Sequence, residues 1–405
     1  MAPSAAGAQP LHVFLVAAEP SGDHLGAALM AALRERANVR FSGVGGAQMR
    51  AAGLASLFDT DELHIIGFAE VLKRLPLLFR RIRETVAAAT AARPDVLVII
   101  DSPDFTHRVA RRVRAAAPHI PIVDYVCPQV WAWRSWRART MRVYLDHVLA
   151  LLPFEPAFLA RNGGPPSTFV GHPLAQQIGE LRPDASEAVR RSARPPIVLA
   201  LPGSRSGEIR RMAEVFGAGL ALAAERAGPL ELVVPTLPRL AGLVEHATAS
   251  WAVKPRVVTD PHEKRALFRT ARAALSKSGT VTLELALAGI PTVAAYRVSA
   301  FEAIVARSMI SVDSVILANL VLGERVIPEL LQEACTPDNI ARELVALLDD
   351  TAARDAQLRA FGRLDEIMEI GRADPSARAA EIVLACGSGN GAPPNRHRVS
   401  TGNLQ

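Results

Sequence analysis

The stretch Asp95–Asp101 reads DVLVIID, and SPDF follows it at once at residues 102–105. Its continuous apolar run predicts a strand that is buried on both faces. Residues 104–117 then carry a helical pattern. A buried strand that leads directly into a helix is the repeating unit of a parallel sheet covered by helices. The stretch therefore indicates an α/β fold.

The same order of strand, loop and helix recurs along the chain, with a pause near Gly171–Pro173. Further strands are predicted at 12–18, 121–126, 148–152, 196–201, 231–235, 273–276 and 292–295, with helices at 22–36, from Glu208 and at 337–348. Thr336 is the expected N-cap of the last helix, with Pro337 at its first position. We therefore expect two doubly wound Rossmann-like domains, 11–173 and 174–354, with a ligand cleft between them.

Two features of the C-terminal part are less regular. Helices at about 355–385 are expected to pack back on the first domain. The tail from 387 to 405 is rich in Gly, Pro, Asn and Ser, and is predicted to be disordered.

The composition narrows the possible partners, the cellular location and the relation to a membrane. The chain has 405 residues, half of them apolar, and a formal net charge of +6, which fits phosphates, nucleic acid or an anionic membrane surface as partners. Its three widely spaced cysteines form no CxxC pair, so reduced thiols and a cytosolic location are expected. No apolar run reaches the roughly 18 residues of a membrane span.

Two loops of the second half are suited to bind anions. Gly203 and Ser204 follow a strand, Ser204 is placed to cap the next helix, and Arg205 adds a bidentate donor for phosphate. Ser276–Thr280 repeats the pattern, with a strand that runs into hydroxyl residues at a second helix start. Together the loops suit a diphosphate, whereas each alone is also an ordinary capped turn. Glu284 either binds ribose hydroxyls or stabilises the helix as a first-turn carboxylate.

Two loops of the first half carry the remaining candidates. Asp101 ends an apolar strand, where a carboxylate is costly, and it is favoured as a general base. Asp104 is expected to cap the following helix. The loop Glu19–Asp23 lacks the dinucleotide fingerprint, and it either holds an acceptor phosphate or forms a tight capped turn.

Two segments combine apolar and basic residues. Residues 128–139 contain three tryptophans among arginines, a mixture that suits stacking on bases or a lipid–water interface, although one tryptophan is expected in the core. Phe68–Arg83 is a basic amphipathic segment, typical either of an anionic membrane surface or of a packed helix with a charged outer face. Pro76 interrupts its pattern.

In their order and spacing, ten motifs resemble the lipid-A-disaccharide synthase family of inverting glycosyltransferases with GT-B architecture. They are EPSGD (19–23), GVGG (43–46), DSPDF (101–105), PQVWAWR (128–134), LPFE (152–155), GHP (171–173), LPGSR (201–205), SGTVTLE (278–284), Tyr296-Arg297 and ANLVLGERVIPELLQE (318–333). The resemblance runs from about Val13 to Ala385.

The resemblance implies a reaction. UDP-2,3-diacylglucosamine and 2,3-diacylglucosamine 1-phosphate would give the β(1→6)-linked disaccharide 1-phosphate and UDP, with inversion. It places this step of lipid A and lipopolysaccharide synthesis at the cytoplasmic face of a Gram-negative inner membrane, with the enzyme attached peripherally. Some family members are homodimers. No DxD pair lies in a nucleotide loop, so catalysis without a metal or other cofactor is expected.

The resemblance also implies roles for individual residues. Asp101 matches the general base, Arg205 the arginine near the diphosphate and Glu284 the acid at the ribose. The implied UDP-sugar site comprises Gly203, Ser204, Arg205, Ser278, Gly279, Thr280, Glu284, Tyr296, Asn319, Gln332 and Glu333. The implied acceptor site comprises Glu19, Ser21, Gly22, Asp23 and Arg134.

Two other functions remain open from the sequence. A UDP-N-acetylglucosamine 2-epimerase shares the architecture but would not need the basic amphipathic segment. A non-catalytic protein that binds RNA through its basic patches would not need Asp101.

Overall fold

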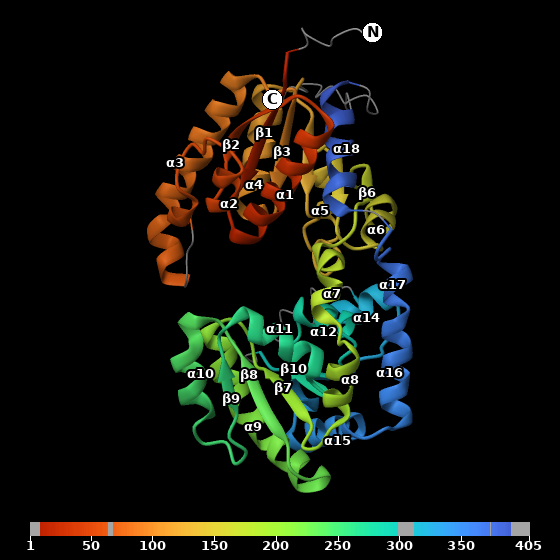
Figure 1. Cartoon of the computed structure of the whole chain (residues 1–405). Coiled ribbons are helices and arrows are strands. Elements are labelled where there is room, and N and C mark those ends of the chain that lie inside the picture. Colours follow the sequence, from red (N-terminus) through yellow and green to blue (C-terminus); the bar gives the residue numbers. More distant parts are fainter. Residues whose placement is uncertain (1–8, 64–67, 299–311, 373, 390–405) are drawn as a thin grey trace. The chain divides into compact units, whose positions relative to one another are not determined.

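The computed structural model describes residues 9–63, 68–298, 312–372 and 374–389, without the side chains of residues 63–74 (Figure 1). The tail predicted to be disordered lies outside these ranges from residue 390 onward. The chain forms two compact units: unit 1 contains residues 1–173 and 372–405, and unit 2 contains residues 174–371. Each unit is described by itself.

Unit 1 is built on a six-stranded parallel sheet in the order β2-β1-β3-β4-β5-β6. Its strands are β1 (Leu11–Ala17), β2 (Val39–Val44), β3 (Val96–Ile100), β4 (Ile122–Tyr125), β5 (His147–Ala150) and β6 (Ser167–Phe169). Successive residues of a strand point to opposite faces, so β3 contributes Leu97 and Ile99 to one core and Val98 and Ile100 to the other. This is the two-sided burial that the DVLVIID stretch predicts.

Helices cover both faces of this sheet. They are α1 (Pro20–Arg36), α2 (Ala47–Ala51), η1 (Thr60–Leu63), α3 (Phe68–Ala92), α4 (Pro103–Ala116), α5 (Arg137–Met141), α6 (Glu155–Arg161) and α18 (Pro375–Gly387). On one face α1 packs beside the C-terminal α18, which buries Ala379 and Val383 in the same core as Leu29 (Figure 1). On the other face α3 and α4 bury Ile82 and Val109.

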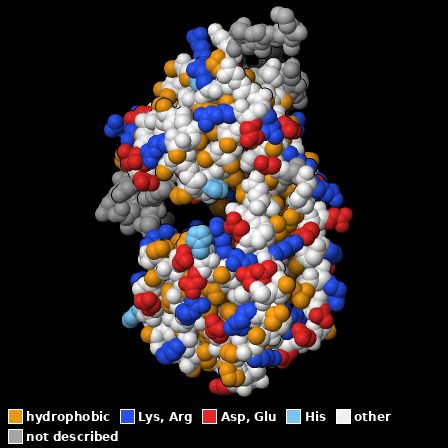
Figure 2. Space-filling view, in the orientation of Figure 1, with side chains coloured by type: hydrophobic (Ala, Val, Ile, Leu, Met, Phe, Trp, Pro, Cys, Tyr) orange, Lys and Arg blue, Asp and Glu red, His pale blue; other side chains and the backbone are white. Residues whose placement is uncertain are grey.

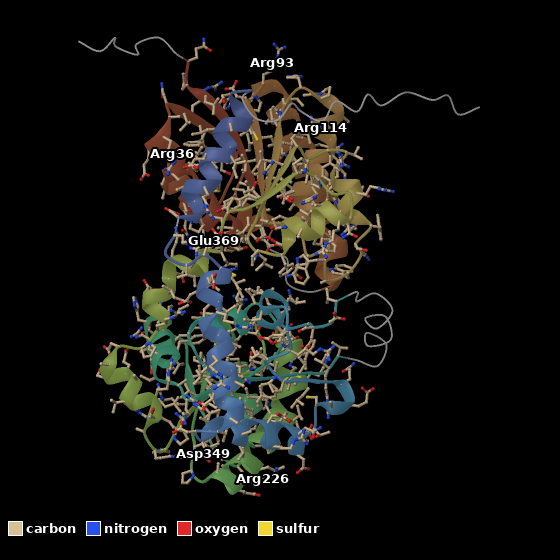
Figure 3. The ribbon with its side chains drawn as sticks, turned by 90° about the vertical axis from the view of Figure 1, so that its right-hand side faces the viewer. Arg36, Arg93, Arg114, Arg226, Asp349 and Glu369 are labelled. Carbon is tan, nitrogen blue, oxygen red and sulfur yellow. The ribbon has the colours of Figure 1, made fainter. Side chains whose placement is uncertain are left out.

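Figure 3 shows the contact of α18 from a second side, where Arg36 at the end of α1 lies beside it. The Nε of Arg36 is 3.9 Å from the Glu381 carboxylate of α18. The last described helix therefore belongs to the first unit, as the sequence predicts for part of the C-terminal segment.

Unit 2 contains a second six-stranded parallel sheet in the order β12-β11-β10-β7-β8-β9. Its strands are β7 (Ile197–Leu201), β8 (Glu231–Pro235), β9 (Arg256–Val258), β10 (Ala273–Ser276), β11 (Thr292–Tyr296) and β12 (Glu329–Leu331). One core packs against α9 (Ser206–Ala227) and α15 (Pro337–Leu348) through Phe216 and Leu344. The opposite core packs against α11 (Pro261–Thr270) and α12 (Val281–Leu287) through Phe268 and Leu285.

The helices of unit 2 follow the strands in the same alternating order. They are η2 (Pro173–Gln177), α7 (Ile178–Leu181), α8 (Ala185–Ser192), α9 (Ser206–Ala227), η3 (Pro238–Leu240), α10 (Ala241–Thr248), α11 (Pro261–Thr270), α12 (Val281–Leu287), α14 (Leu317–Leu322), η4 (Gln332–Ala334), α15 (Pro337–Leu348), α16 (Ala352–Gly362) and α17 (Leu364–Ile367). The expected cap of α15 is confirmed, because the Thr336 hydroxyl accepts a hydrogen bond from the Asn339 N–H at 3.3 Å.

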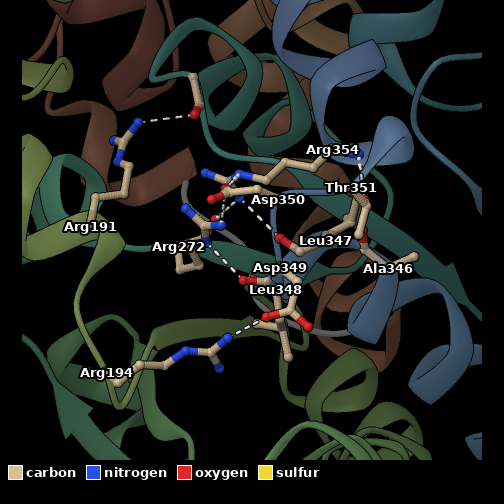
Figure 4. A network of polar contacts seen from close by, with 11 residues as sticks. Arg191, Arg194, Arg272, Ala346, Leu347, Leu348, Asp349, Asp350, Thr351 and Arg354 are labelled. Carbon is tan, nitrogen blue, oxygen red and sulfur yellow. Dashed lines mark hydrogen bonds and ion pairs between the residues drawn. The ribbon is translucent and has the colours of Figure 1, made fainter.

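The expectation that the chain leaves the second domain at about residue 355 is wrong, because buried polar contacts hold α16 in unit 2. Arg354 donates to the carbonyls of Arg272 and Leu347 at 2.8 and 3.0 Å, in the network of Figure 4. The Gln357 amide exchanges hydrogen bonds with the backbone of Thr292 on β11, at 2.8 and 3.1 Å. Arg354 and Gln357 are both buried. The chain therefore returns to unit 1 only at Arg372.

Within the described ranges, no helix has the length and apolar character needed to cross a membrane.

Candidate active site

Each sheet has one point at which the direction of its strand order reverses, and in parallel α/β sheets ligands bind beside such points. In unit 1 the reversal lies between β1 and β3, because β1 pairs with β2 on its other edge. The loops that leave β1 and β3 carry Glu19–Asp23 and Asp101. The Ser21 hydroxyl donates a hydrogen bond of 2.5 Å to Oδ2 of Asp101. The structure thus joins a predicted acceptor residue to the predicted base.

Gly22 allows this close approach. A Cβ atom on Gly22 would lie 3.0 Å from the Ile100 carbonyl oxygen and 3.5 Å from the Asp101 Cβ. The first turn of α1 can therefore begin against the end of β3 only if this position lacks a side chain.

Asp101 sits on an unusual backbone. Asp101 and Ser102 have φ angles of +54° and +47°, in the left-handed region that non-glycine residues rarely adopt. Two contacts hold this conformation: the Ser102 N–H donates to Asp101 Oδ1 at 2.8 Å, and the Thr106 hydroxyl donates to the Asp101 carbonyl at 2.6 Å. Such strain is concentrated at functional sites, where the surrounding structure enforces it. The partly exposed Asp101 carboxylate is thereby fixed at the strand end.

The expectation that Asp104 caps α4 is wrong. The N-cap is Ser102, and Asp104 is an exposed residue of the first helical turn. The left-handed backbone before Pro103 starts the helix earlier than the sequence suggests. In its observed place Asp104 interacts favourably with the helix dipole.

The other residues of the first loop differ in their contacts. Asp23 is buried, and its two oxygens accept hydrogen bonds from the N–H groups of Gln48 and Met49 at 2.8 and 3.0 Å. Its carboxylate therefore stabilises the start of α2. Glu19 is exposed at the N-cap position of α1 and makes no side-chain capping bond. Acceptor contacts by either residue stay predictions.

A buried polar group behind Asp101 was not predicted. Asp124 on β4 is 1% exposed, and its Oδ2 lies 3.2 Å from Nε2 of His107 on α4. Burial raises the pKa of Asp124, and the His107 imidazole partly offsets that rise. The His107 Nδ1 lies 2.8 Å from the Tyr144 hydroxyl. The acid within the apolar run at 121–126 was the signal that could have revealed this group.

The tryptophan-rich loop is anchored by a second buried acid. Trp131 is the core tryptophan, and its Nε1 donates to Glu155 at 3.1 Å. Glu155 also accepts from the Leu152 N–H at 2.9 Å, and burial raises the pKa of its carboxyl to about 8. Trp133 stays 40% exposed with the Arg134 guanidinium 4.2 Å from its ring centroid, and Trp136 is 66% exposed.

The amphipathic segment lies in α3, which continues through Pro76 to Ala92. Its side chains up to residue 74 are outside the described set. Beyond them Ile82 is fully buried and Phe79 is 40% exposed. Arg81 pairs with Glu62 at 2.5 Å and with Glu84 at 2.7 Å. The described part is thus a packed helix with a charged outer face, and its lipid contact stays a prediction.

In unit 2 the reversal of strand order lies between β7 and β10. The loop after β7 turns at Gly203, whose φ of +142° suits glycine. The expected cap by Ser204 is wrong, because α9 begins at Ser206 with Arg205 in the N-cap position and no side-chain cap. The Ser204 N–H instead donates to the Glu208 carboxylate at 3.1 Å.

Lys277 links the two loops at this reversal, although no role was predicted from the sequence for this residue of the second loop. Its ammonium donates to Glu208 Oε1 at 3.0 Å and lies 4.7 Å from the Tyr296 ring centroid. Burial acts to raise the pKa of Glu208, but Lys277 and the Ser204 N–H outweigh it and hold this pKa below its usual value. The lysine directly after the strand at 273–276 was the available signal.

Glu284 lies beyond the second loop, on α12. Its carboxylate pairs with Lys264 of α11 at 3.0 Å and remains partly exposed. Residues Ser278–Thr280 form the turn before this helix, where the Thr282 hydroxyl donates to the Gly279 carbonyl at 2.8 Å. Their contacts with a nucleotide stay predictions.

The remaining predicted donor-site residues follow β12 or precede it. Asn319 is buried, and its amide bonds the backbone of Val326 and Ile327 and the Glu329 carboxylate. It therefore holds the segment that leads into β12. Gln332 accepts from the Val298 N–H at 2.9 Å, and Glu333 is exposed.

In the part of the chain that the structure describes, no three His, Cys, Asp or Glu side chains are grouped as a metal site requires. The independence from metal stays a prediction. All three cysteines are free thiols, as expected. The visible face of unit 2 intersperses basic and acidic side chains, unlike the concentrated basic surface that binds nucleic acid (Figure 2).

Comparison with known proteins decides the family. The model of the lipid-A-disaccharide synthetase family matches residues 13–383. The chain belongs to the lipid-A-disaccharide synthase family. A member from Nitrobacter hamburgensis is 58% identical over 386 residues, which cover 95% of this chain and 98% of that protein. A member from Bradyrhizobium diazoefficiens is 58% identical over 375 residues, covering 92% and 96%. The protein is thus a hexosyltransferase of lipid A biosynthesis, and the prediction of the family is confirmed.

Solved structures show how widely this fold is shared. The UDP-GlcNAc 2-epimerase of Neisseria meningitidis, bound to UDP-GlcNAc, aligns with a TM-score of 0.60 at 12% identity, covering 92% of this chain and 99% of that one. MurG of Acinetobacter baumannii aligns with a TM-score of 0.55 at 15% identity, covering 93% and 99%. The calicheamicin glycosyltransferase CalG4 gives 0.54 at 19%, covering 95% and 100%. The predicted GT-B fold class is confirmed.

Proposed function

We propose that this synthase joins UDP-2,3-diacylglucosamine to 2,3-diacylglucosamine 1-phosphate, giving the β(1→6)-linked disaccharide 1-phosphate and UDP. Membership of the family supports the reaction class. The observation in this chain that carries the proposal is the Ser21–Asp101 contact at the reversal point of unit 1. It holds a strained, partly exposed carboxylate where an acceptor hydroxyl would bind.

Asp101 is the general base of the proposed mechanism. Its carboxylate takes the proton of the acceptor 6-hydroxyl as that oxygen attacks the anomeric carbon of the donor. The bond from this carbon to the UDP oxygen breaks, and the electron pair leaves with UDP. One displacement converts the α-linked donor into a β-linked product. The Ser21 hydroxyl positions the carboxylate oxygen through its hydrogen bond.

Unit 2 would bind the donor through the strand ends of its sheet. The Arg205 side chain is 83% exposed and would donate to the diphosphate, whose charge grows as the bond breaks. Glu284 would accept the ribose hydroxyls, in exchange for its contact with Lys264. Tyr296 at the end of β11 and Gln332 and Glu333 of η4, which follows β12, would contribute further contacts.

Purified protein with both lipid substrates tests the proposal. Mass spectrometry should detect the disaccharide 1-phosphate, and the coupling constant of the new anomeric proton should identify a β linkage. UDP release should require the lipid acceptor. Conversion of UDP-N-acetylglucosamine without an acceptor would instead support the epimerase alternative. Activity should persist in EDTA, and loss that Mg²⁺ restores would contradict catalysis without metal.

The setting of the reaction is also proposed. Both substrates carry acyl chains, so we expect peripheral attachment to the cytoplasmic face of the inner membrane through anionic lipid. The exposed Phe79, Trp133 and Trp136, with basic neighbours, supply suitable side chains. Assembly as a homodimer is proposed from the family resemblance, and sedimentation equilibrium tests it.

A further inference from the structure

Glu208 occupies an unusual position at the reversal point of unit 2. Three groups of the kind that bind phosphate converge on its carboxylate. Lys277 Nζ lies 3.0 Å from Oε1, Arg205 Nη1 lies 3.5 Å from Oε1, and the Ser204 N–H donates to Oε2 at 3.1 Å. They come from two loops, so the arrangement is more than the N-terminus of one helix.

Gly203 makes the space for this carboxylate. A Cβ atom on Gly203 would lie 2.5 Å from the Glu208 Cβ and 2.6 Å from its Oε2. The Glu208 side chain is 10% exposed and that of Lys277 is 20% exposed. Both charges are therefore largely removed from water, where an ionised pair is stabilised only by close mutual contact.

The accessibility of the three donors differs. The Arg205 side chain is 83% exposed, so it can reach a ligand in solvent without breaking a strong contact. Lys277 and the Ser204 N–H are occupied by Glu208. A diphosphate carries more negative charge than one carboxylate and offers more acceptor oxygens, so it would compete for the same donors.

We infer that Lys277 is a further ligand of the donor's diphosphate, and that Glu208 is an internal anion which the diphosphate displaces from Lys277 and the Ser204 N–H. The inference rests on the proposed function and extends it. Glu208 keeps Lys277 in place while the site is empty. Because a ligand must displace this carboxylate from Lys277, the site is selective for a doubly charged group. No covalent step is involved.

Calorimetric titration of the full-length protein with UDP, UMP and uridine tests the role of Lys277. Lys277→Gln should weaken UDP binding on the order of 10- to 100-fold, the range for loss of a charged hydrogen bond, and leave uridine binding within about twofold. Lys277→Arg should recover part of the loss. A UDP affinity of Lys277→Gln within twofold of the wild type would overturn the inference.

Lys254→Gln is the matched control. It removes the same charge from unit 2, but Lys254 is exposed and bonds the Ala249 carbonyl ahead of β9, at the opposite edge of the sheet from the strand ends. Its UDP affinity should match the wild type. An equal loss in both variants would show a general effect of net charge and would contradict a role for Lys277 in direct contact.

Glu208→Gln tests the displacement. Removal of the competing charge should tighten UDP binding about threefold or more, whereas weaker binding would overturn the internal-anion role. Lys277→Gln leaves Glu208 unpaired and could disturb folding, so the double variant Lys277→Gln/Glu208→Gln provides a neutral site. It should bind UDP more tightly than the single lysine variant, because the Ser204 N–H is no longer occupied by a carboxylate, but more weakly than Glu208→Gln, which keeps the lysine. A wild type that fails to bind UDP would refute the proposed function itself, an outcome distinct from equal binding by wild type and Lys277→Gln.

Discussion

The reversal points of the two sheets hold the same place in the strand order and have opposite chemistry. In unit 1 a neutral hydroxyl, Ser21, donates to a carboxylate at 2.5 Å on a left-handed backbone. In unit 2 a lysine and an arginine surround a carboxylate, Glu208, beside a glycine turn. Unit 1 thus presents a negative group that can accept a proton, and unit 2 presents donors that can bind an anion. The fold supplies the position, and the loop residues decide what the position does.

The largest effect is expected from the loss of the proposed base in unit 1, which should impair catalysis and leave the anion site of unit 2 intact. Asp101→Asn should lower kcat by about 10²- to 10⁴-fold, the usual contribution of general base catalysis, because the amide cannot take the acceptor proton. Steady-state assays of UDP release measure the change. Asp104→Asn is the matched control, since Asp104 is an exposed acid three residues further on, and it should retain activity. Full activity of Asp101→Asn would show that Asp101 is not the general base.

A smaller effect tests how unit 1 holds that base. Ser21→Ala removes the only hydroxyl that the first loop places on Asp101 among the described contacts, and should lower kcat about 10-fold. The KM for the UDP-sugar should change little, because that ligand is assigned to unit 2. A rise in this KM without a fall in kcat would contradict the division of roles.

A third prediction concerns stability in unit 1 and its dependence on pH. The buried carboxyl of Glu155 has a pKa of about 8 in the folded protein against 4.5 as its ordinary value. Between these values the folded state binds one proton more than the unfolded state, so the free energy of unfolding falls as pH rises. The contribution is complete below pH 4.5 and lost above about pH 8, with a slope of at most ~1.4 kcal/mol per pH unit.

Urea unfolding from pH 5 to 9 measures this dependence through tryptophan fluorescence. The wild type should lose stability relative to Glu155→Gln as pH rises through the window. Glu35→Gln, on the exposed end of α1, should follow the wild type at every pH. A constant difference between wild type and Glu155→Gln would show that Glu155 does not hold a proton in the folded state.

The smallest expected effect concerns the surface of unit 1. The double variant Arg80→Glu/Trp136→Ser removes a 66% exposed arginine side chain and a 66% exposed tryptophan. Flotation with anionic vesicles should weaken several-fold, since a basic residue near such a surface contributes about 1 kcal/mol. Val189→Ser, which removes a 72% exposed apolar side chain from unit 2, is the control. Unchanged flotation of the double variant would contradict membrane contact through this surface.

The sequence predicts the central strands well and the outer ones poorly. Strands such as β3 and β7 are buried on both faces, so their apolar runs identify them to within a residue. The strands β2, β6, β9 and β12 were missed. They lie at the sheet edges, where burial is incomplete and residues such as Arg40 interrupt the pattern.

The sequence predicts which loops carry the candidate site residues, but it does not predict which side chains contact one another. Asp101 and Arg205 each follow a strand of a parallel sheet, so each lies at the carboxyl edge of its own sheet. Lys277 and Glu208 are 69 positions apart in the sequence. Their pairing depends on the register of β7 against β10 and on the rotamers of both side chains. Asn319 matches a family motif, but burial of its amide in the turn before β12 depends on tertiary packing that no local pattern expresses.

Titration of UDP into the wild type, Asp101→Asn and Arg205→Ala tests the separation of roles most directly. Asp101→Asn should bind UDP within about twofold of the wild type, because the nucleotide is assigned to unit 2. Arg205→Ala should bind it at least about 10-fold more weakly, through loss of a charged donor. Equal weakening by both variants, or unchanged binding by Arg205→Ala, would contradict the assignment of base and anion site to different units.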